Sequence, residues 1–499
     1  MKILMVTSEA VPFAKTGGLA DVCGALPAEL EKLGHEVALI MPAYRQAKNA
    51  GLPLEETGVR FDIPIGSKIV GGTFLKSQLP GTNVPVYLVE HDDYFGRGGL
   101  YQDPSTGEDY RDNCERFVFF CRAVMEAIRL LDLQVDVIHA NDWQTGLVPA
   151  YLKLEYSAVP GYEQIGSLFT IHNMAYQGVF WHWDMLLTGL DWKYFNWQQM
   201  EYFGNLNLLK TGLIFSDRLN TVSPRYAEEI QSAPLGCGLE GVLQARRDVL
   251  SGIVNGVDYR EWDPATDKHL PANFTADTVS IGKAQCKAAL QRELGLPELP
   301  GTPLVAFVGR LATQKGIDLL TATIRDRVQT TEVQWVILGT GEPDYQDQLR
   351  HLAGRYPNRV AVKLEFSNQL AHRIEAGADL FVMPSRYEPC GLNQLYSLKY
   401  GTVPIVRATG GLVDTIVDAS DAAIADKRAT GFRFSEYSEL ALNESLQRAL
   451  SAYSQPELWK QLVRTGMTQD WSWAASARGY GELYRLTANS VRRGLASAR

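Results

Sequence analysis

The sequence predicts an α/β protein built from two doubly wound domains that face each other across a cleft. Short apolar runs of strand length alternate with helical stretches in both halves of the chain, which is typical of mainly parallel sheets. The chain has 499 residues, more than one typical domain. Between the two series, from about residue 252 to 301, the pattern loosens into a stretch rich in proline and glycine.

The first half begins with a strand, a glycine loop, a helix and a second strand. The strand is Lys2–Thr7, the helix runs from about 20 to 33, and the next strand is Val37–Met41. This βαβ unit predicts a right-handed crossover. A helical stretch at 115–131 lies among the further predicted strands, which are 84–89, 135–139, 167–172 and 218–222.

The second half repeats this organisation after a domain crossing near residue 252. A helix is predicted at about 283–294, before the first strand of the new series. The predicted strands are 303–308, 333–338, 360–364, 380–383 and 403–406. We therefore expect a first domain at 1–251 and a second at 252–473.

Composition excludes several classes of protein. The net charge is −9 and no basic run is longer than a pair such as Arg492-Arg493, so nucleic-acid binding is not expected. The six cysteines contain no CxxC pair, which argues against a disulfide framework or a zinc site and favours a reducing compartment. No apolar run is long enough for a membrane span or a signal peptide, so a cytoplasmic location is expected.

The stretch from Ser385 to Tyr396 is the strongest candidate for a site. It follows a predicted strand, so Glu388 should lie in a loop at the carboxyl end, where open α/β sheets bind ligands. The backbone N–H groups near Cys390, Gly391, Leu392 and Asn393 open a predicted helix and suit an anionic or hydroxylated ligand.

Three further glycine loops follow predicted strands. Gly309-Arg310 and Lys315-Gly316 place two cations after the first strand of the second domain, and such cations can hold a diphosphate. A solvated surface pair explains that segment equally well. Lys15-Thr-Gly-Gly18 and Thr409-Gly-Gly are the other two loops, and a plain tight turn is the simpler interpretation of each alone.

Polar residues at two more strand ends complete the candidates. Asp142 follows His139, and His172-Asn173 follows the strand at 167–172. A lone histidine in such a place is more often structural than catalytic, and no HExxH metal motif or GxSxG nucleophile turn is present. Aromatic residues are dense between 176 and 203, where core packing is the default and stacking against sugars the alternative.

Taken in order, these segments resemble the bacterial and plastid glycogen and starch synthases, which are retaining glycosyltransferases with two Rossmann-like domains (the GT-B type). The resemblance spans nearly the whole chain. The residues that carry it are Lys15-Thr-Gly-Gly-Leu, His139-Ala-Asn-Asp-Trp, Ile171-His-Asn, Val254-Asn-Gly, Gly309-Arg-Leu with Gln314-Lys-Gly, Glu388-Pro-Cys-Gly-Leu with Gln394-Leu-Tyr, and Thr409-Gly-Gly-Leu.

The resemblance implies transfer of glucose from ADP-glucose to the non-reducing end of an α-1,4-glucan, with retention and without a metal or pyridoxal phosphate. The partners would be the nucleotide sugar and the glucan, with no membrane. The first domain would take the glucan acceptor and be completed by a C-terminal helix at about 474–499. The second would bind the nucleotide sugar. A plastid stroma would replace the cytoplasm if the chain were a processed plant form.

The resemblance also assigns roles to residues. Arg310 and Lys315 would hold the diphosphate, helped by backbone groups at Gly18, Leu392 and Asn393. Glu388 and the amides beside Cys390 and Gly391 would bind the donor glucose, and His172 would lie near the anomeric carbon. The remaining matches are Lys15, Asp142, Asn173, Asn255, Lys287 and Thr409 around phosphate and sugar, and Tyr101, a weaker match, near the acceptor.

Two positions depart from related patterns. Related retaining transferases often carry a second glutamate eight residues after the first, for the ribose, and here that position is Tyr396, as the synthases have it. Asn141 stands where the family often has histidine. Three alternatives remain at this stage: an α-glucan phosphorylase with pyridoxal phosphate, a non-catalytic glucan-binding relative, and a nucleotide-sugar epimerase.

Overall fold

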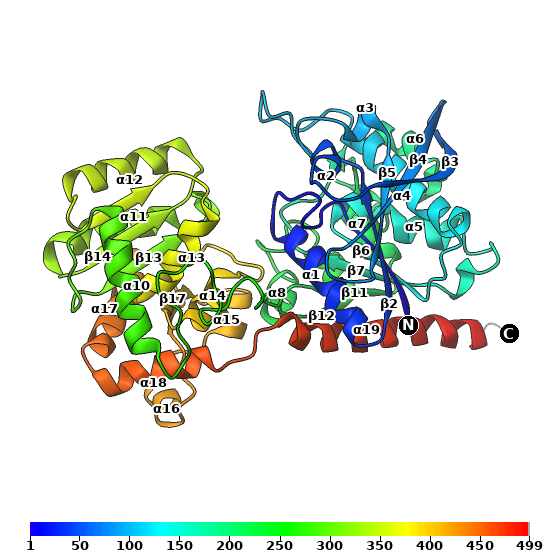
Figure 1. The fold of residues 1–499 in the computed structure, drawn as a ribbon. Helices are drawn as coiled ribbons and strands as arrows, with labels where there is room; N and C mark the ends of the chain where they lie inside the picture. Colours follow the sequence, from blue (N-terminus) through cyan, green and yellow to red (C-terminus); the bar gives the residue numbers. More distant parts are fainter. Residues whose placement is uncertain (498–499) are drawn as a thin grey trace. The chain divides into compact units, whose positions relative to one another are not determined.

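The structure is a computed structural model that describes residues 1–497. Its contacts group the chain into two compact units. Unit 1 comprises residues 1–222, 227–256 and 473 onward, and unit 2 comprises 223–226 and 257–472. Figure 1 traces the elements of both along the sequence.

Unit 1 is built on a nine-stranded sheet of order β12-β11-β7-β6-β1-β2-β5-β4-β3. The first seven strands in this order are parallel, and β4 and β3 add an antiparallel hairpin at one edge. The strands are β1 (Lys2–Val6), β2 (Glu36–Pro42), β3 (Glu55–Ile65), β4 (Lys68–Gln78), β5 (Pro85–Glu90), β6 (Val137–Asn141), β7 (Gly166–Ile171), β11 (Arg218–Thr221) and β12 (Leu250–Gly252). The hairpin is an element that sequence analysis missed.

Helices pack on this sheet because they present one apolar face. In α1 (Gly18–Lys32), for example, Val22, Leu26 and Leu30 recur at helical spacing and are fully buried. The other helices of unit 1 are α2 (Arg45–Lys48), α3 (Asp92–Phe95), α4 (Asn113–Leu130), α5 (Leu147–Leu154), α6 (Met185–Thr188), α7 (Leu208–Phe215), α9 (Glu240–Ala245) and α19 (Trp473–Ser497). A short helix, α8 (Pro224–Glu229), spans residues of both units.

The C-terminal helix α19 packs on α1, β6 and β7 of unit 1. Tyr484 Oη lies 2.8 Å from His139 Nδ1, and Asn220 donates to Tyr480 Oη at 3.2 Å, so buried polar groups of two strands are satisfied by this helix. The helix was expected at about 474–499, and residues 498 and 499 lie outside the described part of the chain.

Unit 2 contains a six-stranded, fully parallel sheet of order β15-β14-β13-β16-β17-β18. Its strands are β13 (Leu304–Val308), β14 (Gln334–Leu338), β15 (Val360–Lys363), β16 (Leu380–Met383), β17 (Val403–Arg407) and β18 (Phe432–Phe434). The helices are α10 (Val279–Leu294), α11 (Ile317–Thr330), α12 (Pro343–Arg355), α13 (Asn368–Gly377), α14 (Asn393–Tyr400), α15 (Gly411–Thr415), α16 (Asp421–Ala425), α17 (Glu439–Tyr453) and α18 (Pro456–Met467).

Each sheet has one point at which the order of strands reverses. In unit 1 the chain proceeds from β1 to β2 in one direction and from β6 to β7 in the other, so the reversal lies between β1 and β6. In unit 2 it lies between β13 and β16. Open α/β sheets bind ligands outside the carboxyl ends of the strands at such a reversal. The predicted class of two doubly wound α/β domains is confirmed, and the reversals show where to look for a site in each.

Candidate functional site

The loop of Glu388 follows β16, directly at the strand reversal of unit 2. The carboxylate is buried, with 7% of the side chain exposed, and its Oε2 atom accepts from Lys315 Nζ at 2.5 Å and from Ser385 Oγ at 3.0 Å. These partners offset the cost of burying a charge. Within residues 1–497 the second oxygen, Oε1, has no protein donor, so it is available to a ligand hydroxyl.

Two glycines let the neighbouring loops close around this carboxylate. Gly316 has φ +71°, and a Cβ there would lie 2.0 Å from the Pro384 carbonyl oxygen. Gly410 has φ +46°, and a Cβ there would lie 1.9 Å from the Glu388 carbonyl oxygen. Only glycine fits such approaches. The loops after β13, β16 and β17 are thereby held together, and Thr409 is buried beside them.

Two cations belong to this cluster. Lys315 pairs with Glu388 while 21% of its side chain stays exposed. Arg310 is exposed, and in the described chain its guanidinium makes one side-chain hydrogen bond, from Nη2 to Gln314 Oε1 at 3.3 Å. A guanidinium with most of its donors unused is suited to the oxygens of a phosphate.

The start of α14 adds backbone donors to the same place. In residues 1–497 the N–H groups of Gly391, Leu392 and Asn393 donate to no protein acceptor, as expected for the first turn of a helix. The Asn393 side chain donates to the Val308 carbonyl at 2.6 Å, which ties this helix to the end of β13. Cys390 is buried, so it can offer a ligand its backbone but little of its side chain.

In unit 1, a carboxylate that sequence analysis missed organises the Lys15 loop. Glu9 follows β1 and is 3% exposed. It accepts from the Thr16 N–H at 2.5 Å, the Thr16 hydroxyl at 2.6 Å, the Gly17 N–H at 3.2 Å and the Tyr101 hydroxyl at 2.6 Å. The only signal in the sequence was an acidic residue directly after a strand. Glu9 joins the predicted Lys15 loop to the predicted Tyr101.

The loop itself is open on its outer side. Lys15 and Asp21 form an ion pair of 2.6 Å, with 45% and 31% of the two side chains exposed. A Cβ at Gly17 or Gly18 would meet no atom of residues 1–497 within 4 Å. Because no contact in that range requires glycine there, the open space suits the close approach of a ligand to the backbone.

The reversal between β1 and β6 also brings Asp142 and His172 together. Asp142 adopts φ +57°, and its carboxylate accepts the His172 N–H at 2.7 Å. Burial is the main cause that raises the pKa of Asp142 to about 7, and hydrogen bonds from the backbone at His172 and Asn173 act against it. This carboxyl group therefore titrates near neutral pH.

His172 is held neutral and in one tautomer. Burial lowers its pKa to about 3. Its Nε2 atom lies 3.0 Å from Asn141 Oδ1, and the Asn141 amide nitrogen donates to the carbonyls of Val6 and His139. The amide oxygen must accept, so Nε2 carries the proton and Nδ1 is the acceptor. Asn141, the position that departs from the family pattern, thus orients the histidine.

The remaining predicted residues of unit 1 lie as follows. Asn173 is partly buried and its Oδ1 atom accepts the Ala175 N–H at 3.0 Å, which shapes the turn after β7. Asn255 is 6% exposed, and its buried Oδ1 atom has no hydrogen-bond partner in the described chain. A buried amide oxygen without a donor is uncommon and suits a polar ligand group.

Comparison with known proteins decides the family. Residues 2–245 match the family described as starch synthase catalytic domain, and residues 295–465 match glycosyl transferases group 1. The glycogen synthase of Rhodopirellula baltica is 46% identical over 504 aligned residues that cover 99% of both chains. This chain belongs to the glycogen and starch synthase family.

Solved structures agree with this membership of the synthase family. The catalytic domain of starch synthase IV from Arabidopsis thaliana, bound to ADP and acarbose, has a TM-score of 0.87 and 32% identity, covering 98% of this chain and 99% of that one. Sucrose-phosphate synthase from Thermosynechococcus elongatus, at 18% identity and a TM-score of 0.56, shares the fold. The predicted family, the GT-B fold and a glucan-elongating glucosyltransferase are confirmed.

One predicted residue of unit 2 lies away from the others in that unit. Lys287 is in α10, and its ammonium is 2.6 Å from the carboxylate of Asp379. Asp379 directly precedes β16 and accepts a hydrogen bond from the first N–H of β13. These groups are at the amino edge of the sheet, whereas Glu388 is at the carboxyl edge. Lys287 also donates to the carbonyls of Pro300 and Thr302. Its position gives no support to substrate binding and instead makes it a buried structural cation.

Tyr396, which replaces the second glutamate of related transferases, is part of a stack. Its ring lies 3.8 Å from that of Trp262, nearly parallel to it, and Trp262 stacks in turn on His372 at 3.7 Å. Aromatic packing therefore fills this position in the synthase, and a ribose must find its partners elsewhere.

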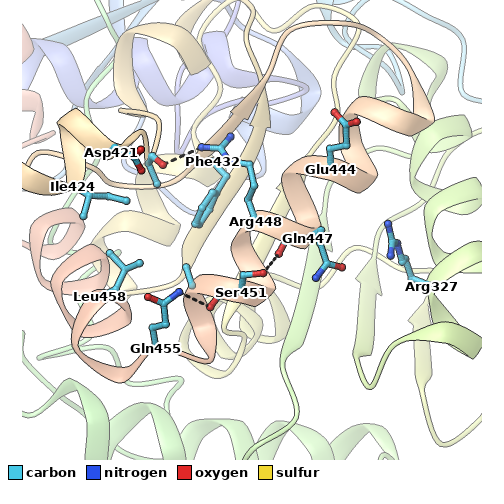
Figure 2. A pocket seen from close by; sticks show the side chains of 12 residues that line it. Arg327, Asp421, Ile424, Phe432, Glu444, Gln447, Arg448, Ser451, Gln455 and Leu458 are labelled. Carbon is cyan, nitrogen blue, oxygen red and sulfur yellow. Dashed lines mark hydrogen bonds between the residues drawn. The ribbon is translucent and has the colours of Figure 1, made fainter.

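A hollow in unit 2 lies apart from the candidate residues. It is lined by side chains from α11, α16, α17, α18 and the start of β18, among them Arg327, Asp421 and Arg448 (Figure 2). Phe432 in its wall begins β18, which places the hollow toward the amino edge of the sheet. None of the predicted site residues lines it.

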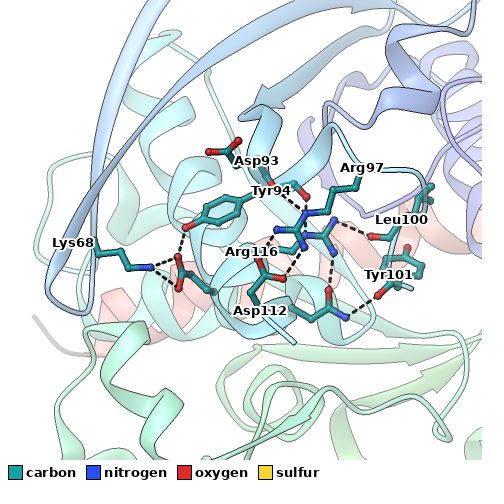
Figure 3. A network of polar contacts seen from close by, with 10 residues as sticks. Lys68, Asp93, Tyr94, Arg97, Leu100, Tyr101, Asp112 and Arg116 are labelled. Atoms are coloured by element: carbon teal, nitrogen blue, oxygen red, sulfur yellow. Dashed lines mark hydrogen bonds and ion pairs between the residues drawn. The ribbon is translucent and has the colours of Figure 1, made fainter. Parts of the chain in front are cut away.

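A polar network supports Tyr101 in unit 1 (Figure 3). Arg116 of α4 is fully buried and donates to the carbonyls of Tyr94 and Leu100 and to Asn113 Oδ1. Asn113 donates in turn to the Tyr101 carbonyl at 3.0 Å. A buried guanidinium with these partners fixes the loop between α3 and α4 and thereby the hydroxyl that reaches Glu9.

Within residues 1–497, no group of three or more His, Cys, Asp and Glu side chains is arranged to hold a metal ion. In the same range, no helix is long and apolar enough to cross a bilayer.

Proposed function

We propose that the chain transfers glucose from ADP-glucose to the non-reducing end of an α-1,4-glucan with retention of configuration. The observation that carries this proposal is the cluster at the strand reversal of unit 2. There a buried carboxylate, two cations and the unbonded N–H groups of α14 occupy one edge of a sheet. Such a set matches a neutral sugar attached to a diphosphate.

The diphosphate would be held by Arg310, Lys315 and the amides at Leu392 and Asn393. When the bond between the glucosyl carbon and the phosphate oxygen breaks, the electron pair goes to the diphosphate, and fixed positive groups stabilise the charge that develops. These cations would do what a metal ion does in other transferases, so we propose that no metal ion or pyridoxal phosphate is required.

The donor glucose would be held by Glu388 and the backbone beside Cys390, Gly391 and Thr409. Because Oε2 already accepts from Lys315 and Ser385, we propose that Oε1 accepts a sugar hydroxyl and that the carboxylate positions the ring. The acceptor hydroxyl would form the new bond on the same face and lose its proton as the phosphate leaves.

Unit 1 would supply the acceptor side of the reaction and unit 2 the nucleotide-sugar side. We propose that Lys15 and the Gly18 amide contact phosphate, that His172, Asn173 and Asn255 contact the sugar, and that Tyr101 contacts the acceptor. Neutral His172 can exchange hydrogen bonds with hydroxyls without adding a positive charge beside an electron-poor sugar carbon. Asp142 would keep the His172 backbone in place.

The cytoplasm is the location we propose. All six cysteines lie in the described range and are free, as a reducing compartment requires. The glycogen synthases of 46% identity are bacterial proteins.

Labelled ADP-glucose or UDP-glucose, incubated with the chain and glycogen, tests the reaction. We expect label in the polymer from ADP-glucose, at an unchanged rate when EDTA is present. Incorporation only from UDP-glucose would refute the donor, and loss of incorporation with EDTA would refute the metal-free mechanism.

A further inference from the structure

Four neighbouring strands of unit 2, β13, β16, β17 and β18, end beside a cluster of charged and aromatic side chains. Each strand or the loop after it contributes one residue. They are Asp318 in the first turn of α11 after β13, Arg386 after β16, Arg407 at the end of β17 and Tyr437 after β18. The roles proposed above use none of the four. Because Glu388 lies two residues after Arg386 in the same loop, contacts that fix Arg386 also bear on this carboxylate.

The Asp318 carboxylate is the centre of the cluster. Its Oδ2 atom accepts from Arg386 Nη2 at 2.7 Å, and its Oδ1 atom accepts from the Tyr437 hydroxyl at 2.5 Å. The Arg386 guanidinium also lies over the Tyr437 ring, 4.3 Å from its centroid. A charge-assisted hydrogen bond together with a cation–π contact holds a guanidinium in one orientation. We call the three side chains of Arg386, Asp318 and Tyr437 the Arg386 clamp.

The Tyr437 hydroxyl is a permanent donor in this clamp. Burial and the hydrogen bond to Asp318 raise the pKa of Tyr437 above its usual value. The hydroxyl therefore keeps its proton near neutral pH, and the clamp does not depend on pH in that range.

The backbone of Arg386 is fixed from two further directions. Its N–H donates to the Gln314 carbonyl at 2.8 Å, and its carbonyl accepts from Arg407 Nη1 at 2.5 Å. The same Arg407 atom lies 3.4 Å from the carbonyl of Ser385. Side chain and backbone of Arg386 are thus held by the three neighbouring loops together.

Ser385 connects the clamp with Glu388. It directly precedes Arg386, it is 1% exposed, and its hydroxyl donates to Glu388 Oε2 at 3.0 Å. A rotation of the backbone at Arg386 would displace this donor and the carboxylate that it holds. Since misplacing a group in an active site by about 1 Å can lower the rate about 10²-fold, even a small rotation matters.

The clamp itself adds little to the stability of the fold. The side chains of Arg386 and Asp318 are 46% and 34% exposed, and ion pairs in contact with water contribute little to folding. Its effect should therefore appear in the geometry of the loop and not in the melting temperature.

From these observations we infer that Arg386, Asp318 and Tyr437 are positioning residues that fix the orientation of the Glu388 carboxylate toward the donor glucose. The inference rests on the proposed function, which assigns the sugar to Glu388. The clamp acts through Ser385 and the backbone, whereas Arg310 is the exposed cation assigned to the diphosphate. Loss of the clamp should therefore lower kcat and leave the affinity for ADP unchanged.

Arg386→Ala tests the inference with the largest effect. We expect kcat with ADP-glucose and glycogen to fall about tenfold, while the Kd of ADP and the melting temperature stay at the wild-type values. Arg386→Lys can still donate to Asp318 and should recover part of the loss. Arg428→Ala is the matched control, because Arg428 is an arginine of unit 2 whose ion pair with Asp426 lies in the exposed segment between α16 and β18.

A double variant shows whether the side chains act as one unit. Tyr437→Phe keeps the ring and removes one hydrogen bond to Asp318, so kcat should fall about threefold. Because both side chains act through Asp318, Arg386→Ala/Tyr437→Phe should be no slower than Arg386→Ala alone. A double variant whose loss of kcat is the product of the two single losses would overturn the inference.

Hydrogen exchange of the backbone amides from 385 to 393 gives a measurement that needs no turnover. Exchange should be faster in Arg386→Ala than in the wild type and unchanged in Arg428→Ala. Wild-type kcat in Arg386→Ala would overturn the inference, and so would a loss of ADP affinity as large as the loss of kcat. Failure of the wild type to transfer glucose from ADP-glucose would instead refute the proposed function. Unchanged exchange in Arg386→Ala would then still overturn the clamp.

Discussion

The strand reversals of the two units have the same geometry but contrasting chemistry. In unit 2 the loops carry one buried carboxylate, Glu388, matched by Lys315, with Arg310 exposed beside it. In unit 1 the loops carry the buried Glu9 and the partly buried Asp142, whose partners are mostly backbone N–H groups and hydroxyls. The first arrangement leaves positive charge for a ligand, whereas the second uses its charge to shape loops. A shared fold therefore fixes where sites form, and the loop residues decide what each site does.

The largest effect should come from the exposed cation of unit 2. Arg310→Ala should lower kcat about 10²-fold, because a preorganised donor for the developing charge is lost. The melting temperature should not change, since Arg310 is exposed. Steady-state kinetics with ADP-glucose and thermal unfolding check both points, with exposed Arg355→Ala in α12 as the control. Wild-type turnover in Arg310→Ala would contradict the view that the strand reversal of unit 2 supplies positive charge to the ligand.

A smaller effect should follow from releasing the Lys15 loop in unit 1. Glu9→Gln keeps the shape of the side chain but places an amide among four donors, so the loop should shift and kcat/KM should fall about tenfold. Tyr101→Phe removes one of those donors and should lower kcat/KM by a smaller factor. Steady-state kinetics of both variants show which decrease in kcat/KM is larger. A decrease in Tyr101→Phe as large as that in Glu9→Gln would argue that the Tyr101 hydroxyl contacts the substrate directly.

Lys287 should matter for folding but not for turnover. Its side chain and that of Asp379 are 6% and 13% exposed, so Lys287→Ala leaves a buried carboxylate unpaired and should cost about 3–5 kcal/mol of unfolding free energy. The KM for ADP-glucose should stay near the wild-type value at a temperature where the variant is folded. Denaturant unfolding measures the stability and steady-state kinetics measure the KM. A raised KM for ADP-glucose without loss of stability would show that Lys287 takes part in substrate binding.

Near neutral pH the smallest effect should come from two histidines of unit 1, His139 and His172. Burial lowers the pKa of His139 and of His172 to about 3, below the usual value near about 6.5. The unfolded chain binds protons on these groups that the folded chain does not, so stability should fall as pH drops from about 6.5 toward about 3. His172→Asn should reduce this loss when urea unfolding is compared at a neutral and an acid pH. An unchanged pH dependence would show that His172 is not held neutral.

Much of the fold could be predicted because parallel strands are buried on both faces. β6, β7 and β16 are buried at every residue; β16 is a continuous apolar run, and β6 and β7 are apolar apart from a few polar residues. The β3–β4 hairpin was missed because one of its faces is exposed, so its apolar residues alternate with polar ones and with glycine. The apolar pattern of the hairpin in the sequence is therefore weaker than that of a strand buried on both faces.

The grouping of Lys315 with Glu388 was predictable although 73 residues separate them. Each residue lies in a glycine-containing loop that follows a strand, and the two strands, β13 and β16, are adjacent in the sheet. Glu9 has no such motif, and its role depends on Tyr101, far along the chain. Lys287 was misplaced because a match within a helix does not reveal which edge of the sheet the side chain reaches.

Calorimetric titration with ADP tests the central claim most directly, namely that the strand reversal of unit 2 is the diphosphate site. The wild-type chain should bind ADP in the presence of EDTA, and Arg310→Ala should bind it about tenfold or more weakly, a loss of about 1.4 kcal/mol. Arg355→Ala should match the wild type. Equal ADP affinity in Arg310→Ala and wild type would contradict the account.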